Sequence, residues 1–260
     1  MALAAQGLPP GGRRTMNTAT PMLSVENLGK SFRGLRAVNQ VAFEVPRGDI
    51  VALIGPNGAG KTTTFNLIAG ALPPSDGKVV LDGHDITGLG QAAICRAGVG
   101  RTFQIVKPFA GLSVEENVMV GALRHDNGDV DKARAASRAT LDLLELGDKA
   151  RDPAQTLTLP DRKRLEVAKA LATRPKLLLL DEVMAGLRPV ECDRMVAILT
   201  GLNKETGLTI LLIEHVMRAV MALSDHVVVL HHGEKIAEGT PAEVTSHPKV
   251  LECYLGEDHE

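Results

Sequence analysis

Eight consecutive residues have the types and the spacing of a phosphate-binding loop. They are Gly55-Pro56-Asn57-Gly58-Ala59-Gly60-Lys61-Thr62, and they match the pattern G-x-x-x-x-G-K-[ST]. Glycines allow successive backbone N–H groups to converge on phosphate oxygens. Lys61 adds a positive charge near the β- and γ-phosphates, and the Thr62 hydroxyl is suited to ligate Mg²⁺. This stretch therefore predicts binding of a nucleoside triphosphate together with Mg²⁺.

Two acidic residues follow an apolar run later in the chain. Residues 177–180 are all leucine, and Asp181 and Glu182 come directly after them. A carboxylate at the tip of a buried strand is suited to hold Mg²⁺, and its neighbour is suited to act as the base for an attacking water. An apolar run that ends in two acids is usually just a strand leaving the core. The functional interpretation depends on the phosphate-binding loop in the same chain.

A third apolar run, residues 208–213, ends in Glu214 and His215. A lone histidine at a strand end usually has a structural role. Here it would fall at the carboxyl edge of the same sheet, where ligands of such sheets gather, so we interpret His215 as a γ-phosphate contact. Gln104 lies in the stretch R-T-F-Q-I, whose composition alone indicates only an exposed loop amide.

The elements that must position these residues follow from the apolar pattern. Residues 22–54 alternate short β-like runs with turns and predict an antiparallel meander, and the continuous apolar run 50–54 is typical of a strand buried on both faces. Residues 113–156 have helical patterns. From residue 176 onward, apolar strands alternate with helices, which predicts an α/β fold with a mostly parallel sheet.

The totals are those of an ordinary intracellular α/β protein. The 260 residues carry a formal net charge of −2, which gives no electrostatic footprint for nucleic acid. The three cysteines are far apart and favour a reducing cytosol over a disulfide framework. No apolar run reaches the roughly 18 residues that a membrane span needs. Residues 1–21 lack the apolar region of a signal peptide and predict a loose tail, with Met16 or Met22 as alternative translation starts.

Taken in order, these stretches resemble the ATP-binding subunit of ABC transporters, from about Met22 to Gly256. The resemblance identifies residues 55–63, G-P-N-G-A-G-K-T-T, as the Walker A loop and residues 177–182 as the Walker B strand. It identifies Gln104 as the Q-loop glutamine, a ligand of the nucleotide and of Mg²⁺, and His215 as the H-loop histidine. It further implies that Thr63 contacts ATP, that Phe32 stacks on adenine, and that Glu182 and His215 are catalytic.

The resemblance also implies a fold and its division. We expect a P-loop NTPase (RecA-like) core with a mostly parallel sheet, an antiparallel β-subdomain and an inserted α-helical subdomain. Residues 22–260 would form the ATPase domain. Within it, residues 22–104 and 161–260 would form the nucleotide-binding core with the β-subdomain, and residues 105–160 the helical subdomain.

A finer resemblance is to the ATPase subunits of branched-chain amino-acid importers. The stretches G-R-T-F-Q-I-V-K-P-F, L-S-V-E-E-N-V and the ending Y-L-G-E carry it. Urea-type and lipopolysaccharide-export ATPases are similar. The family implies two ATP-binding subunits under two membrane-embedded permease subunits at the cytoplasmic face of the membrane, with a periplasmic solute-binding protein. Residues 103–109 would press on the permeases.

One motif departs from the family pattern. The signature L-S-G-G-Q, which binds the partner subunit's ATP, falls on Leu157-Thr158-Leu159-Pro160-Asp161. Thr158 is a suitable N-cap residue, and Asp161 three residues on makes a capping-box-like pair, so the helix start is sound. The same stretch is poorly suited to bind the partner's phosphate. Pro160 removes an N–H donor, and a hydrogen bond to a charged group is worth about 1.5–3 kcal/mol. Leu159 adds bulk, and Asp161 brings a like charge.

The sequence leads to three hypotheses for the function, of which the third is the least supported. The first is an ATPase that powers an importer, with a weakened signature that favours a heterodimer over a homodimer. The second is a regulatory or scaffold subunit that binds ATP with little hydrolysis. The third, a soluble ABC protein of DNA repair or translation, usually needs a coiled-coil insertion or two ATPase units, which this chain lacks. Val183, where the family commonly has proline, puts the coupling function of the following loop in doubt.

Overall fold

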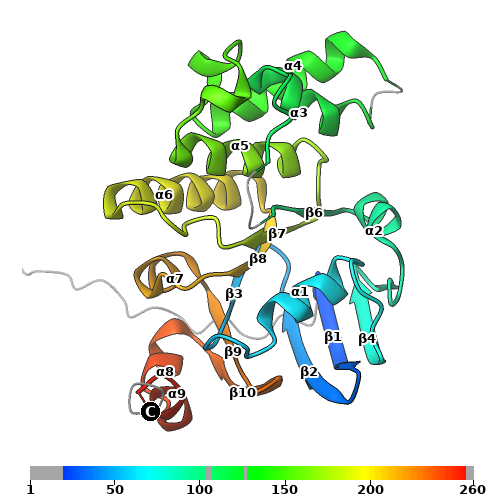
Figure 1. Ribbon diagram of the computed structural model, residues 1–260, viewed down its shortest axis with the longest axis vertical. Coiled ribbons are helices and arrows are strands. Elements are labelled where there is room, and N and C mark those ends of the chain that lie inside the picture. Colours follow the sequence, from blue (N-terminus) through cyan, green and yellow to red (C-terminus); the bar gives the residue numbers. More distant parts are fainter. Residues whose placement is uncertain (1–19, 104–106, 126–127, 256–260) are drawn as a thin grey trace, which may run out of the picture.

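A computed structural model describes residues 20–103, 107–125 and 128–255. Two sheets and several helical layers make up this part of the chain (Figure 1). Gln104, the first nineteen residues of the expected tail and Gly256 lie outside the described residues. The assignments made for them therefore stay predictions. Within the described residues, no helix is both long enough and apolar enough to cross a membrane.

The smaller sheet is antiparallel and has the strand order β2-β1-β4-β5. Its strands are β1 (Leu23–Phe32), β2 (Leu35–Val45), β4 (Asp76–Leu81) and β5 (His84–Asp85). The tight turn between β1 and β2 has Arg33 and Gly34 at positive φ, with φ values of 44° and 94°. The antiparallel meander predicted for residues 22–54 is confirmed for β1 and β2, whereas residues 50–54 join the larger sheet. Strands β4 and β5 form a short hairpin.

The larger sheet has six strands in the order β10-β9-β3-β8-β7-β6. They are β3 (Ile50–Ile54), β6 (Val99–Arg101), β7 (Leu177–Asp181), β8 (Thr209–Ile213), β9 (His226–His231) and β10 (Glu234–Gly239). All neighbours pair in parallel except β10, which is antiparallel to β9 at the edge. The predicted mostly parallel sheet is confirmed.

Strand β3 lies between two apolar cores. Ile50, Ala52 and Ile54 belong to a core shared with β7, β8 and the helices α3 to α7. Val51 and Leu53, on the other face, belong to a core shared with the antiparallel sheet, α1 and α2. Alternate side chains of a strand point to opposite faces, so a strand covered on both sides must be apolar throughout. This explains why β3, β7 and β8 are buried at all five positions.

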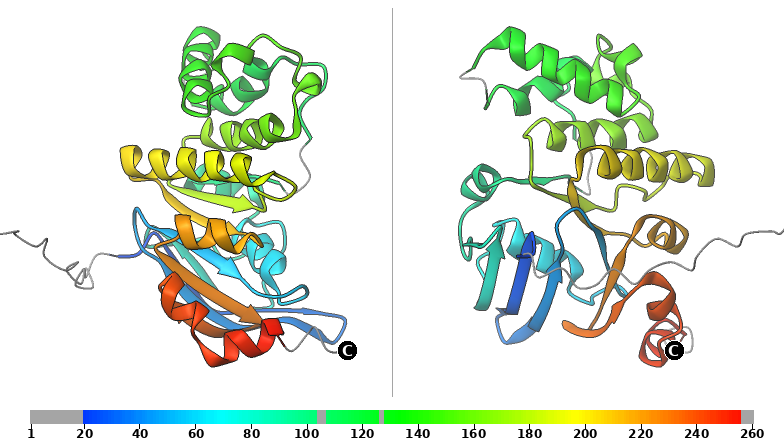
Figure 2. Two further views of the ribbon diagram at one scale, coloured as in Figure 1. Left: turned by 90° about the vertical axis from the view of Figure 1, so that its left-hand side faces the viewer. Right: turned by 180° about the vertical axis from the view of Figure 1, so that it is seen from behind.

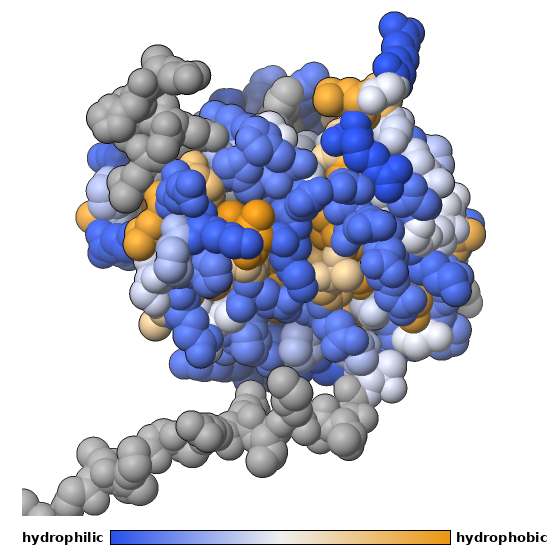
Figure 3. All heavy atoms as spheres, turned by 90° about the horizontal axis from the view of Figure 1, so that it is seen from below, coloured by the Kyte–Doolittle hydropathy of each residue, from blue (hydrophilic) through white to orange (hydrophobic). Residues whose placement is uncertain are grey.

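The helices cover both faces of the larger sheet (Figures 1 and 2). The helices nearest to it are α1 (Lys61–Ile68), α2 (Gln91–Ala97), α5 (Leu159–Leu171), α6 (Pro189–Thr206) and α7 (Met217–Leu223). At the far end from β10 lie α3 (Val114–Ala122), α4 (Val130–Leu143) and the short 3₁₀ turns η1 (Gly147–Lys149) and η2 (Ala154–Thr156). At the C-terminal end, α8 (Pro241–Thr245) and α9 (Pro248–Leu255) pack beside β10. The face that carries α8 and α9 is mostly polar (Figure 3).

Helix α3 begins, within the stretch predicted to be helical, with a capping box. Ser113 accepts a hydrogen bond from the Glu116 N–H, and the Glu116 carboxylate accepts one from the Ser113 N–H at 2.7 Å. This reciprocal capping box satisfies two helix-end donors. Helices α3, α4 and α5 pack on one another and join the same core as β7 and β8. The exact division between helical subdomain and core stays a prediction.

Candidate active site

Three strand ends meet at one edge of the larger sheet. In the pairing register, Leu53 of β3 faces Ile213 of β8, and Ile213 faces Asp181 of β7. The loop after β3 therefore begins level with Asp181-Glu182 and Glu214-His215. The sequence patterns predicted these stretches separately, and the register brings them to one edge, where ligands of parallel sheets bind.

The glycine-rich loop is packed so closely that two of its positions admit only glycine. Gly55 has φ 147°, and a Cβ there would lie 2.1 Å from the Leu230 carbonyl oxygen on β9. Gly60 has φ 97°, and its Cβ would lie 2.7 Å from the Ala37 carbonyl oxygen on β2. Both sheets thus press on the loop and fix its backbone. A fixed backbone keeps the amide groups oriented before a ligand arrives.

Lys61 and Thr62 begin helix α1 directly after the loop. The Lys61 ammonium is buried inside the loop and donates hydrogen bonds to the Gly55 carbonyl at 2.6 Å and the Pro56 carbonyl at 2.8 Å. The Thr62 side chain is exposed and Thr63 is half-buried. The positive end of the helix and the ammonium add to one another, so this corner attracts an anion.

The Asp181 carboxylate is placed to bind a cation through one of its two oxygens. One carboxylate oxygen, Oδ2, lies 3.2 Å from Nη2 of Arg101. The other, Oδ1, is buried and has no hydrogen-bond partner within the described ranges of the chain. Burial raises the pKa of this carboxyl, and the hydrogen bond and charge of Arg101 oppose the rise. A buried oxygen of this kind is costly unless something binds it. Asp181 and the exposed Thr62 hydroxyl are therefore suitable Mg²⁺ ligands.

Glu182 and His215 touch. His215 Nε2 lies 3.0 Å from Glu182 Oε1, which joins the ends of β7 and β8 through side chains. Glu182 has φ 50°, a left-handed conformation that costs about 1–3 kcal/mol for a residue other than glycine. The Glu182 N–H donates to the Ile213 carbonyl at 3.0 Å, and the Glu182 carbonyl accepts from the Ala185 N–H at 3.2 Å. These bonds hold the strained backbone in place.

Sequence reasoning missed a buried lysine in this site. Lys163 on α5 is buried, and its ammonium donates to the Glu182 carbonyl at 2.7 Å. Burial lowers the pKa of Lys163, while the carboxylates of Glu214, Glu182 and Asp181 oppose that effect. A lysine inside a helix that otherwise faces the core was the signal. A buried ammonium needs nearby negative charge. The sequence offers that charge in Asp181, Glu182 and Glu214, the three acids at the ends of two strands.

Glu214 was noted only as the neighbour of His215, and it is buried. Its Oε1 accepts a hydrogen bond from the Met184 N–H at 2.9 Å, which ties the end of β8 to the loop after Glu182. Burial raises the pKa of Glu214 to about 7, although hydrogen bonds from the backbone and the charge of Lys163 act in the other direction. This carboxyl is therefore partly protonated near neutral pH.

The comparisons with known proteins agree with this geometry. Residues 38–185 match the family model described as ABC transporter, and residues 234–260 match one described as branched-chain amino acid ATP-binding cassette transporter. The branched-chain amino acid transport ATP-binding protein BraF of Pseudomonas aeruginosa is 41% identical over an alignment of 251 residues, which covers 91% of this chain and 98% of BraF. LivG of Escherichia coli, with the same description, is 39% identical over an alignment of 251 residues, which covers 91% of this chain and 98% of LivG.

The chain is an ATPase of the ABC transporter family. Solved structures of such cassettes share its fold. The ADP form of the ABC cassette MJ1267 superposes with a TM-score of 0.83 at 31% identity, over 92% of this chain and all of that one. The dimeric cassette MJ0796 bound to ADP and phosphate has a TM-score of 0.77 at 23% identity, over 85% of this chain and 99% of that one. The expected P-loop NTPase fold is confirmed.

The stretch that we predict to be a divergent signature, residues 157–161, lies at the start of helix α5. Thr158 is the N-cap residue, yet its side chain makes no capping bond to the backbone. Its hydroxyl donates instead to Asp161 Oδ2 at 2.9 Å. The predicted N-cap residue and its pairing with Asp161 are confirmed, but the pair bonds side chain to side chain and not side chain to backbone as in a capping box. The physical reason is that two cations already hold the Asp161 carboxylate, so the hydroxyl binds the charge rather than a backbone amide.

The Asp161 carboxylate is neutralised within the chain. It is buried, forms an ion pair with Lys149 at 2.5 Å and forms a second, very short one with Arg164. Burial alone raises the pKa of this carboxyl, but the hydrogen bonds from Lys149, Thr158 and Arg164 outweigh it and hold the pKa below its usual value. The expected repulsion between Asp161 and a phosphate is thus reduced. The missing amide at Pro160 and the exposed bulk of Leu159 remain.

Phe32 lies at the end of β1 and is 41% exposed. The Lys30 ammonium lies 5.3 Å from the centre of its ring. The neighbouring strand β2 contacts the glycine-rich loop through Ala37, so the β1–β2 hairpin lies against the site. An exposed aromatic ring on this hairpin is suited to stacking, and its role toward adenine stays a prediction, as does that of Gln104.

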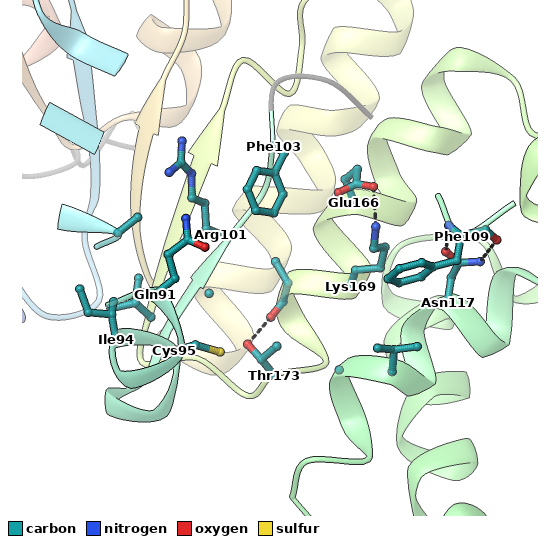
Figure 4. Close-up of a pocket in the computed structure, with 16 residues that line it drawn as sticks. Gln91, Ile94, Cys95, Arg101, Phe103, Phe109, Asn117, Glu166, Lys169 and Thr173 are labelled. Carbon is teal, nitrogen blue, oxygen red and sulfur yellow. Dashed lines mark hydrogen bonds and ion pairs between the residues drawn. The ribbon is translucent and has the colours of Figure 1, made fainter. Parts of the chain in front are cut away.

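A largely apolar groove of about 270 Å³ lies between α2, β6, α3 and α5 (Figure 4). Phe103 and Phe109 line it and are 54% and 48% exposed. Two cations accompany these rings. The Arg101 guanidinium carbon lies 5.5 Å from the Phe103 ring centre, and the Lys169 ammonium lies 5.1 Å from that of Phe109. Exposed aromatic rings beside an apolar hollow are typical of a protein-binding surface.

Titration of Glu214 gives a testable pH dependence of stability. The folded chain keeps the Glu214 proton up to a pH of about 7, while an unfolded glutamate releases it near 4.5. Stability should therefore fall as the pH rises through this window, by about 3 kcal/mol from this group. Glu214→Gln has no such proton to lose and should lack this part of the fall. Urea unfolding at about pH 5 and about pH 8 measures the difference.

The control for this experiment is Glu205→Gln, at an exposed position near the end of α6. It should follow the pH dependence of the unaltered chain. Identical pH dependence of the free energy of unfolding in the Glu214→Gln variant and the unaltered chain would contradict a raised pKa at Glu214.

Proposed function

We propose that the chain is the ATP-hydrolysing subunit that powers an ABC importer for branched-chain amino acids or similar small solutes. The observation that carries the catalytic part is the contact of Glu182 with His215 beside the glycine-rich loop. The cargo is supported by the match of residues 234–260 to the branched-chain family model and by the names of BraF and LivG.

The roles in hydrolysis follow from the positions of the side chains. The loop amides from Gly55 to Gly60, with Lys61, Thr62 and Thr63, bind the phosphates, and Phe32 stacks on adenine. Thr62, Asp181 and Gln104 would hold Mg²⁺, which when bound would neutralise charge on the transferring phosphate. Glu182 accepts a proton from the attacking water, and His215 orients Glu182 and contacts the γ-phosphate.

The partners are a second ATP-binding subunit and two permease subunits, and through the permeases a periplasmic solute-binding protein. The chain would work at the cytoplasmic face of the membrane. The groove with Phe103 and Phe109 supports docking of a permease, because it is largely apolar and includes Arg101, which contacts Asp181. Asp181 lies at the edge of the larger sheet where β3, β7 and β8 end, which we call the catalytic edge. Nucleic acid is not an expected partner, since the net charge is −2.

The signature supports a pair of unequal sites. Pro160 offers no N–H, and Leu159 stands 45% exposed where a backbone would have to approach a phosphate. This chain would complete its partner's ATP site weakly, while its own site would be completed by the partner's signature. A heterodimer with one strong and one weak site follows, whereas a homodimer would carry the weakness twice.

Restoring the glycines tests the weak signature. The double variant Leu159→Gly, Pro160→Gly supplies a second amide and removes the bulk, so ATP turnover by the chain alone should rise roughly 10–100-fold. Asp161→Gln by itself should give no such rise, because the Asp161 charge is already neutralised by Lys149 and Arg164. Steady-state phosphate release over a range of protein concentrations measures this. Equally brisk turnover by the unaltered chain alone would contradict the weak signature.

The divergent signature also favours one alternative function, a regulatory subunit that binds ATP with little hydrolysis. For the cargo, the alternative is that the chain is the ATPase of a urea-type or lipopolysaccharide-export system.

Replacement of the proposed base, Glu182, separates the enzyme from the regulatory subunit. In the assembled transporter, Glu182→Gln should lower ATP hydrolysis at least roughly 100-fold while ATP binding persists. The matched control, Glu205→Gln, should leave turnover unchanged. Hydrolysis that Glu182→Gln does not alter would favour the regulator.

A further inference from the structure

One arginine joins the groove to the proposed Mg²⁺ site. Arg101 is the last residue of β6, and its side chain lines the groove next to Phe103 (Figure 4). The same guanidinium reaches the catalytic edge, where Nη2 lies 3.2 Å from Asp181 Oδ2 and Nη1 donates to Asn66 Oδ1 at 2.8 Å. A single side chain thus contacts both surfaces.

The guanidinium and a metal ion would share one carboxylate. Asp181 has one oxygen engaged by Arg101, and its other oxygen has no partner in the part of the chain that the structure describes. A positive charge at 3.2 Å lowers the attraction of this carboxylate for a second cation, and the effect is strong because Asp181 is buried. While Arg101 stays in place, Asp181 is a weaker ligand for Mg²⁺.

The hydrogen bonding of the Arg101 guanidinium is incomplete within the described residues. Its Nε is buried and has no acceptor among the described residues. A buried N–H without an acceptor is unfavourable, so an acceptor brought into the groove would compete for this side chain. The Phe103 ring lies 5.5 Å from the guanidinium carbon and is 54% exposed, so an occupant of the groove can contact it directly.

We propose that Arg101 is a positioning residue that competes with Mg²⁺ for Asp181 and is withdrawn when a membrane subunit occupies the groove. This inference rests on the proposed function for the identity of the occupant. The occupant would present an apolar face to Phe103 and an acceptor, a carboxylate or a free backbone carbonyl, to Arg101. Binding at the groove would then strengthen the Mg²⁺ site, and ATP hydrolysis would be limited to subunits docked on a permease.

The isolated chain tests the competition without any partner. The measurement is the affinity for a fluorescent ATP analogue with and without Mg²⁺, and the readout is the factor by which Mg²⁺ strengthens binding. Arg101→Met should raise this factor roughly tenfold and leave the Mg²⁺-free affinity unchanged. Arg101→Gln, a polar substitute, should raise it similarly. Arg101→Lys keeps the charge and should stay near the unaltered chain.

A matched control removes a nearby cation that does not touch Asp181. Arg124 is exposed and donates to the Cys95 carbonyl at 2.8 Å at the border of the same groove. Arg124→Met should leave the Mg²⁺ factor unchanged. An unchanged or lower factor in both Arg101→Met and Arg101→Gln, with normal Mg²⁺-free binding, would overturn the inference and leave the proposed function standing. Failure of the unaltered chain to bind the analogue at all would overturn the proposed function itself.

The assembled transporter tests the withdrawal. With both permease subunits present, the unaltered chain should reach the Mg²⁺ factor of isolated Arg101→Met, and the variant should show no further rise on assembly. If the unaltered chain shows the same Mg²⁺ factor alone and in the assembled transporter, the link between the groove and the Mg²⁺ site is overturned.

Discussion

The structure depends on three apolar strands that are buried on both faces and end level with one another. Because β3, β7 and β8 have no polar residue before their last positions except Thr209, the hydrophobic effect fixes their place in the centre of the sheet. Their parallel register then brings the phosphate loop, Asp181-Glu182 and Glu214-His215 to the same edge. The positions of the polar groups thus follow from the burial of apolar ones.

The second constraint is the balance of charge at that edge. Asp181, Glu182 and Glu214 place three carboxyl groups near one another at the end of a low-dielectric core. Arg101 and Lys163 supply the positive charges, and protonation of Glu214 near neutral pH relieves the remainder. Each cation comes from a different surface. Lys163 belongs to the helix that carries the proposed signature, and Arg101 lines the groove, so this edge of the sheet is linked by charge to both proposed partner surfaces.

Most of the fold and the main site segments could be predicted from the sequence, because each depends on a local pattern. The apolar runs of β3, β7 and β8 and the glycine-rich loop identify themselves within a few residues. Lys163 and Arg101 could not be placed, since their partners lie 19 and 80 residues away along the chain. That the Thr158 hydroxyl bonds to a side chain and not to the backbone could not be predicted for a similar reason, although Thr158 is the N-cap residue as expected. Its hydroxyl binds Asp161, whose charge is fixed by Lys149, a residue of a separate turn.

The central claim is that the glycine-rich loop and the Lys61 ammonium hold the phosphates of ATP. The most direct test is the dissociation constant of Mg-ATP for the unaltered chain, for Lys61→Ala and for Lys204→Ala, a substitution at an exposed position of α6. The account predicts that Lys61→Ala weakens binding roughly 10–100-fold, through the loss of a charge-assisted hydrogen bond, and that Lys204→Ala has no effect. Equal affinity of the Lys61→Ala variant and the unaltered chain would contradict it.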